Sequence, residues 1–281
     1  TLKAAYPEVD FIAQKDFRRD VLRIANPYSH AGFVEKIFNI LNTLISLLIF
    51  SERLNLRVWQ SILMRLRVYV LGELLPALPD ESYILFLVDD NIFVRDFSLK
   101  DVVPLLRAQQ DALGFSLRLG SNITHCYTSD QPQPLPRFVP VETGILKFDW
   151  TTSELDFGYP LEVSSSAYRA KDMFPIIAKQ PFRNPNELEF QLAVSAKAFS
   201  RKMPFLLCPE RSYTFCNPLN VVQNVTPNKA GASLEYSSQR LADLFDQGYR
   251  IKVEAYHGFI PQSCHQEVPL EFYRLWLAPV K

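Results

Sequence analysis

The stretch Tyr83–Asn91 constrains the fold of this chain more than any other, because the apolar run Tyr83–Val88 leads directly into two adjacent carboxylates. The run has the length of a strand buried on both faces, as in a parallel sheet. The strand must end where Asp89 and Asp90 reach solvent, since buried unpaired carboxylates are strongly unfavourable. In open α/β sheets the carboxyl ends of the strands form the ligand crevice. Two carboxylates there suit a hard divalent cation bridged to phosphate oxygens, and the alternative is a solvated Asp-Asp-Asn turn.

The composition is that of a globular protein, and its net charge does not favour binding to nucleic acid. Its 281 residues are 48% hydrophobic, which is enough for one large domain or two small ones with a sizeable core. Lys+Arg and Asp+Glu both number 30, so no global field favours nucleic acid as a partner. The sequence contains neither GxGxxG nor GxxxxGK[ST], so a glycine-rich phosphate loop is not expected.

The cysteines are widely spaced and form no CxxC pair. This spacing disfavours a zinc site and favours a reduced compartment, so we expect a cytoplasmic protein. The residues are Cys126, Cys208, Cys216 and Cys264.

Residues 34–78 are an unusual segment in which a densely apolar run, 38–50, precedes apolar residues interleaved with arginines. The run is shorter than the ~20 residues needed to span a bilayer. We predict two helices, which either pack as a buried pair or make a contact with a membrane surface or another subunit.

The other elements follow from periodicity and turn residues. Arg118 stands in an otherwise apolar strand, so we expect it either to pair with a carboxylate or to face an anionic ligand. We expect helices at 101–113, 170–179 and 237–248. We expect strands at 113–119 and 250–257 and a strand-like run at 265–276. The loops are a proline-rich stretch at 128–143 and a segment at 182–189 that begins a further helix.

Several of these segments, in this order and spacing, resemble glycosyltransferase-like proteins of the GT-A fold. The resemblance is good over about residues 80–200, looser over 205–270, and leaves 34–78 as a helical insertion. It rests on Leu87–Phe93, Gly114–Asn122, Trp150, Asp156–Leu161, Tyr168-Arg169 and Asn184–Glu189. The fold implied is a Rossmann-like α/β domain over 1–281 with a mixed, mainly parallel central sheet flanked by helices. The first strand expected of such a domain is not found before Val9.

The resemblance implies a metal site at Asp89, Asp90 and Asn91, where GT-A enzymes carry an Asp-x-Asp motif. The motif holds a divalent metal, Mn²⁺ or Mg²⁺, which bridges the phosphates of a nucleotide-sugar as the leaving diphosphate develops charge. Asn91 stands where the motif has its second Asp. His265, or else His257, corresponds to the C-terminal histidine that many members add as a ligand.

The resemblance also implies a general base that takes a proton from the acceptor hydroxyl. Glu189 or Glu187 is the candidate, and Asp156 is the alternative. The residues implied in donor and acceptor binding are Arg118, Asn122, Trp150, Tyr159 and Asn186.

The function implied is transfer of a sugar from a nucleotide-sugar donor to an unidentified acceptor. A catalytically inactive glycosyltransferase-like binding or scaffold protein is the first alternative, and it is favoured by Asn91, by the missing first strand and by the apolar segment 34–78. A nucleotidyltransferase that uses the same paired carboxylates is the second.

Overall fold

The computed structural model describes residues 13–25, 81–219 and 236–275, together with positions 7, 9 and 229. The chain divides into two compact units. One comprises Thr1–Ser82 and Ala170–Leu192, and the other comprises Tyr83–Arg169 and Ala193–Lys281. The predicted helical insertion 34–78 lies outside the described residues, so this insertion, its proposed membrane or subunit contact, and the single-domain organisation remain predictions.

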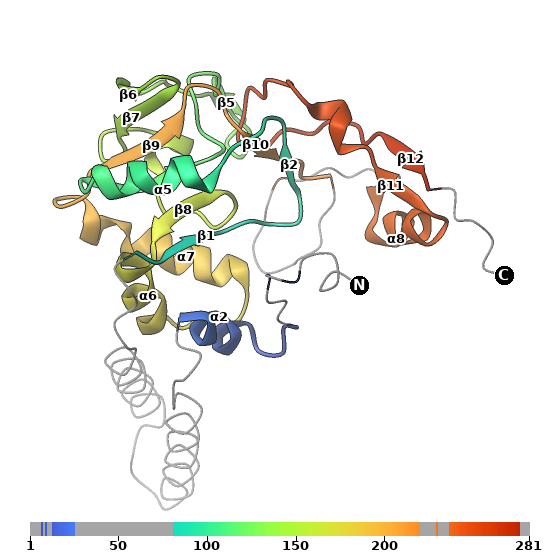
Figure 1. Ribbon diagram of the computed structural model, residues 1–281, viewed down its shortest axis with the longest axis horizontal. Helices are drawn as coiled ribbons and strands as arrows, with labels where there is room; N and C mark the ends of the chain where they lie inside the picture. The colour runs from blue at the N-terminus through green and yellow to red at the C-terminus, as the bar shows by residue number, and fades with distance from the viewer. Residues whose placement is uncertain are drawn as a thin grey trace, which may run out of the picture. The chain divides into compact units, whose positions relative to one another are not determined.

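The second unit contains a six-stranded sheet with the strand order β1-β8-β3-β9-β7-β6 (Figure 1). The mixed α/β class is confirmed, but the prediction of a mainly parallel sheet is wrong. Only β3 and β9 run parallel, and every other neighbouring pair in this sheet is antiparallel. The strands are β1 (Tyr83–Leu85), β3 (Ala112–Ser116), β6 (Val139–Glu142), β7 (Ile145–Asp149), β8 (Ser166–Arg169) and β9 (Phe205–Pro209).

Local turns explain part of this difference. A tight hairpin joins β6 to β7, and Gly144 supplies the positive φ of 76° that the turn requires. Residues 128–143, expected to be an irregular loop, therefore contain two strands, β5 (Gln131–Pro132) and β6. Pro140 is tolerated because β6 lies at the edge of the sheet, where a missing backbone donor costs little.

The run Tyr83–Val88 was expected to form a strand buried on both faces, and this is also corrected. The strand β1 ends at Leu85, occupies the other edge of the sheet and is only half-buried. The Phe86 amide still bonds to the Ser166 carbonyl oxygen at 3.1 Å, but the next residue, Leu87, is 48% exposed. An apolar run of this length fits an edge strand followed by a partly covered loop as well as it fits a central strand.

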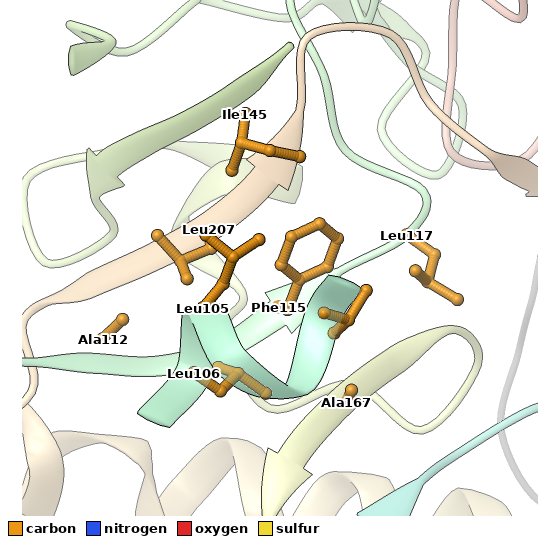
Figure 2. Packing of buried hydrophobic residues seen from close by; sticks show 9 residues of the cluster. Leu105, Leu106, Ala112, Phe115, Leu117, Ile145, Ala167 and Leu207 are labelled. Atoms are coloured by element: carbon orange, nitrogen blue, oxygen red, sulfur yellow. The ribbon is translucent and has the colours of Figure 1, made fainter. Parts of the chain in front are cut away.

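Helix α5 (Leu99–Ala108) covers the sheet next to β3 and forms the main core with it (Figure 1). The Ser98 side chain caps the helix by accepting a hydrogen bond from the Lys100 amide at 3.1 Å. The helix ends before residue 113 because β3 begins at Ala112. In Figure 2, Leu105 of the helix lies beside Phe115 of β3 and Leu207 of β9. This buried cluster is Val102, Leu105, Leu106, Ala112, Phe115, Leu117, Ile145, Ala167 and Leu207.

Three short β-pairs and a helix complete the described part of the second unit. The expected strand at 250–257 is only three residues long and is followed by a 3-10 helix, η4. The predicted helix at 237–248 is confirmed as α8, with Ser237 as its N-cap. The elements are β2 (Asn91–Phe93) with β10 (Thr214–Cys216), β4 (His125–Cys126) with β5, β11 (Tyr249–Ile251) with β12 (Phe272–Arg274), α8 (Ser238–Asp246), and the 3-10 helices η1 (Leu155–Gly158), η2 (Ala196–Phe199) and η4 (Val253–Tyr256).

The first unit contains α2 (Phe17–Ala25), α6 (Ala170–Lys179) and most of α7 (Pro185–Ser195). The predicted helix at 170–179 is confirmed with the same bounds. The Arg18 guanidinium ties α2 to the end of α6 by donating to the carbonyl oxygens of Ala178 at 2.9 Å and Gln180 at 3.2 Å. The rings of Phe17 and Phe182 pack edge to face at 5.8 Å. These contacts hold α2 against α6.

Candidate functional site

The acidic turn expected after the apolar run is present between β1 and β2. Asn91 closes it, because its side-chain oxygen accepts from the Val88 amide at 2.9 Å and its own amide donates to the Val88 carbonyl oxygen at 3.2 Å. The Asn91 side-chain nitrogen donates to the Cys216 sulfur at 3.3 Å. Both polar atoms of the Asn91 side chain are thus engaged within the turn and with β10, while Asp89 is exposed and Asp90 is half-buried.

Asp90 has one carboxylate oxygen, Oδ1, that is buried and unpartnered in the described part of the chain. Burial, followed by the charge of Asp89, raises the pKa of the Asp90 carboxyl above its ordinary value, and Cys216 and Arg118 offset only part of this. A bound cation would supply the missing partner and relieve the repulsion between the carboxylates, so these residues fit a divalent metal.

Arg118 follows β3 and is 3% exposed, and it pairs with a carboxylate, one of the two alternatives left open by the sequence. Its Nε atom lies 3.9 Å from the Glu162 Oε2 atom, and its NH1 atom donates to the Ser164 hydroxyl at 2.8 Å. Burial raises the pKa of the Glu162 carboxyl, but Arg118 and the hydroxyls of Ser164 and Ser166 outweigh this, so the pKa is lowered. Glu162 is therefore ionised and compensates the buried guanidinium.

Asp156 lies in η1 and interacts with the same arginine. Burial raises the pKa of its carboxyl, and the charge of Arg118 and hydrogen bonds from the Cys126 and Cys264 thiols offset this only in part. The preceding residue, Leu155, has a φ of 52°, which is a strained conformation for a bulky side chain. Such strain is often found at functional positions. Asp156 thus has a raised pKa and follows a residue with a strained backbone; a raised carboxyl pKa is one property of candidate general bases.

His265 forms a β-bridge with Cys216. Burial lowers its pKa to about 4, and the charge of Arg118 acts in the same direction. It is therefore neutral at physiological pH and has a nitrogen lone pair available for a proton or a metal. The alternative candidate, His257, is exposed. Within the ranges that the structure describes, no group of three or more His, Cys, Asp or Glu side chains is arranged to hold a metal by itself.

Three further candidates occupy different environments in the second unit. The Asn122 side chain joins two loops by donating to the Ser212 hydroxyl at 2.9 Å and the Pro261 carbonyl oxygen at 2.6 Å. Trp150 is buried, and its indole nitrogen donates to the Met203 carbonyl oxygen at 2.9 Å. Tyr159 is 37% exposed and is the more accessible of the two aromatic candidates.

The remaining candidates, Asn186, Glu187 and Glu189, lie at the start of α7 in the other unit. Glu187 accepts an ion-pair hydrogen bond from Arg183 at 2.8 Å, and its amide donates to the Asn184 side-chain oxygen at 2.9 Å. The hydrogen bond with Arg183 lowers the pKa of the Glu187 carboxyl. Glu187 thus has the contacts of a helix-capping residue.

Sequence reasoning missed Glu162 and the buried thiols. Glu162 stands between Leu161 and Val163, so it is an isolated charge in apolar surroundings, as Arg118 is. That shared property was the available signal, because two buried opposite charges need each other. Cys126, Cys208, Cys216 and Cys264 are all buried free thiols, and three of them contact the site.

Comparison with known proteins relates the chain to glycosyltransferases. It is 28% identical over 159 residues to the bifunctional glycosyltransferase pgtA of Dictyostelium discoideum, a match that covers 50% of this chain and 20% of that protein. The chain thus matches only about a fifth of that relative's length. No family model matches the sequence, and no solved structure matches it either. Among the described residues, no helix has the length and apolar character needed to cross a membrane.

Proposed function

We propose that this chain transfers a sugar from a nucleotide-sugar donor to a hydroxyl of an acceptor, with a divalent metal as cofactor. The observation that carries the proposal is the similarity of half the chain to a glycosyltransferase. The Asp89–Asp90 turn supports it, since it offers a buried carboxylate oxygen without a hydrogen-bond partner in the described structure.

In this proposal Asp90 and Asp89 hold Mn²⁺ or Mg²⁺, and neutral His265 is a further candidate ligand. A metal bound there would supply positive charge to offset the charge that develops on the leaving diphosphate. Two carboxylates suffice when substrate phosphates complete the coordination, as is common for Mg²⁺. Asn91 acts as the residue that closes the turn and so orients Asp90.

Asp156 is the general base in this proposal and accepts the proton of the acceptor hydroxyl. A base works best with a pKa near the working pH, and burial raises the pKa of Asp156 in that direction. The pKa of Glu187 is lowered and its oxygens are engaged with Arg183, which favours a structural role. Glu189 remains the alternative base.

The proposal is tested by thermal unfolding with UDP-, GDP-, CMP- and dTDP-sugars, each with and without Mn²⁺. A ligand at 100 times its Kd stabilises the folded state by about 2.7 kcal/mol, which raises the Tm by several degrees. Asp90→Asn should lose the metal-dependent part of the shift, whereas Asp96→Asn, a matched change at an exposed carboxylate, should keep it. No shift with any of these donors would contradict the proposal.

A binding protein without turnover is the second candidate. It is favoured by Asn91, whose side chain is engaged in the turn and so does not provide the second carboxylate of an Asp-x-Asp motif. This candidate predicts a donor-dependent rise in Tm without release of nucleoside diphosphate when acceptors are added.

A further inference from the structure

The pair Arg118–Glu162 is the most completely buried charged group of the site. The two side chains are 3% and 2% exposed. Glu162 accepts hydrogen bonds from the Ser164 amide at 2.5 Å, from the Ser165 amide at 3.0 Å and from the Ser166 hydroxyl. Such a set of donors fixes the carboxylate far more rigidly than a single ion pair would.

The serines also connect this carboxylate to the arginine. The Ser164 hydroxyl donates to the Glu162 Oε2 atom at 2.5 Å and accepts from the Arg118 NH1 atom at 2.8 Å. The Glu162 backbone is held as well, because the buried Tyr168 hydroxyl donates to its carbonyl oxygen at 3.0 Å. Glu162 is therefore held by several hydrogen bonds and is linked to the guanidinium through the Ser164 hydroxyl.

Several charged or titratable groups face Asp156. Arg118 lies after β3, His125 and Cys126 belong to β4, and Cys264 lies in the loop before His265. The Cys264 sulfur also contacts the Arg118 carbonyl oxygen at 3.9 Å. The guanidinium is the principal cation among these groups, and its effect on Asp156 depends on how far Glu162 neutralises it.

We propose that Glu162 is a positioning residue of the transferase site, which fixes the Arg118 guanidinium and balances its charge so that Asp156 can act as a base. The inference rests on the function proposed above. It implies that the charge of Arg118 is compensated by Glu162 inside the protein, while the Arg118 Nε atom has no hydrogen-bond partner among the described residues.

The first test measures the Asp156 carboxyl directly, without turnover. Its titration is followed by NMR in protein labelled at the aspartate carboxyl carbons, with Asp156→Asn to assign the signal. Glu162→Gln should move this titration to lower pH, since the uncompensated arginine then favours the charged form of Asp156. Arg118→Gln should move it to higher pH. Glu210→Gln, the same change at an exposed glutamate of the unit, should leave it unchanged.

A second variant separates charge from position. Glu162→Asp keeps the charge but shortens the side chain and so moves the carboxylate away from the guanidinium. The Asp156 titration should therefore shift to lower pH by less than in Glu162→Gln, and the turnover number should fall with it while KM changes little. This variant also carries the test if Glu162→Gln does not fold, because loss of one member of a buried pair is strongly destabilising.

The outcomes distinguish a failure of the positioning role of Glu162 from a failure of the proposed transferase function. An unchanged Asp156 titration in folded Glu162→Gln, or wild-type turnover in Glu162→Asp, would overturn the positioning role. Titration shifts as expected in a protein that binds no nucleotide-sugar would instead support the electrostatic coupling and refute the transferase function.

Discussion

Gly114 permits β3 to approach β8 closely, and β8 carries Tyr168, whose hydroxyl bonds to the Glu162 carbonyl oxygen. Gly114 lies opposite Tyr168 of β8, and a Cβ atom at Gly114 would lie 2.5 Å from the Tyr168 Cδ1 atom and 2.9 Å from the Ala167 carbonyl oxygen. The ring cannot swing away freely, because Tyr168 is fully buried and its hydroxyl donates to the carbonyl oxygens of Pro160 at 2.9 Å and Glu162 at 3.0 Å. Gly114→Ala should therefore force the ring or the strands apart.

The expected cost follows from two opposing effects. Overpacking a closed core costs about 1–3 kcal/mol, whereas alanine in place of glycine within a strand gains roughly 0.5–1 kcal/mol. The difference is a net loss of up to about 2.5 kcal/mol, centred near 1 kcal/mol, which should lower the urea midpoint by about 0.5 M at a slope near 2 kcal/mol/M.

A double-mutant cycle with Tyr168→Phe shows whether the anchored ring is responsible. The phenylalanine ring lacks the hydroxyl anchor and can shift, so Gly114→Ala should cost less in that background. A wild-type midpoint for Gly114→Ala would refute the reasoning, since the strands would then separate without cost.

Three further predictions concern the core and the titratable groups. Phe115→Ala removes a fully buried ring from the main core and should cost about 3–5 kcal/mol in urea unfolding, whereas Phe245→Ala, at a ring that is 57% exposed, should cost less. Asp156→Asn should lower turnover by about 10²–10⁴-fold. Because the folded-state pKa of Asp156 is raised, its stabilising contribution is lost as pH rises through that pKa, so the variant should gain stability over the wild type at pH 7 relative to pH 4. His265 has a folded-state pKa lowered from 6.5 to about 4, so the wild type should lose stability as pH falls through that window and His265→Gln should lose less.

The local elements of this chain could be predicted because their signals are local. Helix 170–179 has its observed bounds, and Ser98 and Ser237 cap the helices that they precede. These features depend on residues within a few positions of each other, where periodicity and capping chemistry act. The acidic turn at Asp89 and Asp90 was predictable for the same reason.

Strand pairing and the buried charge cluster could not be predicted in this way. The run Tyr83–Val88 does not specify whether a strand formed there has neighbouring strands on one side or on both. In the structure β1 has one neighbouring strand, β8, which lies far along the chain. Glu162 and Arg118 are likewise distant in sequence, and neither side chain carries a local signal of its partner. Only the apolar residues on either side of each charge indicated that it would need an oppositely charged partner.

The balance of charges around Arg118 gives a physical reason for the proposed metal dependence. One guanidinium, Arg118, faces Glu162, Asp156 and Asp90, and Asp89 adds its charge beside Asp90. Since Glu162 already compensates the arginine, the remaining carboxylates would repel the diphosphate of a nucleotide-sugar. If the proposed function is right, donor binding there would therefore need a cation between the carboxylates and the phosphates. Asp90→Asn tests this through its loss of the metal-dependent part of donor binding, because the variant also has one repelling charge fewer and its metal-independent binding should not weaken.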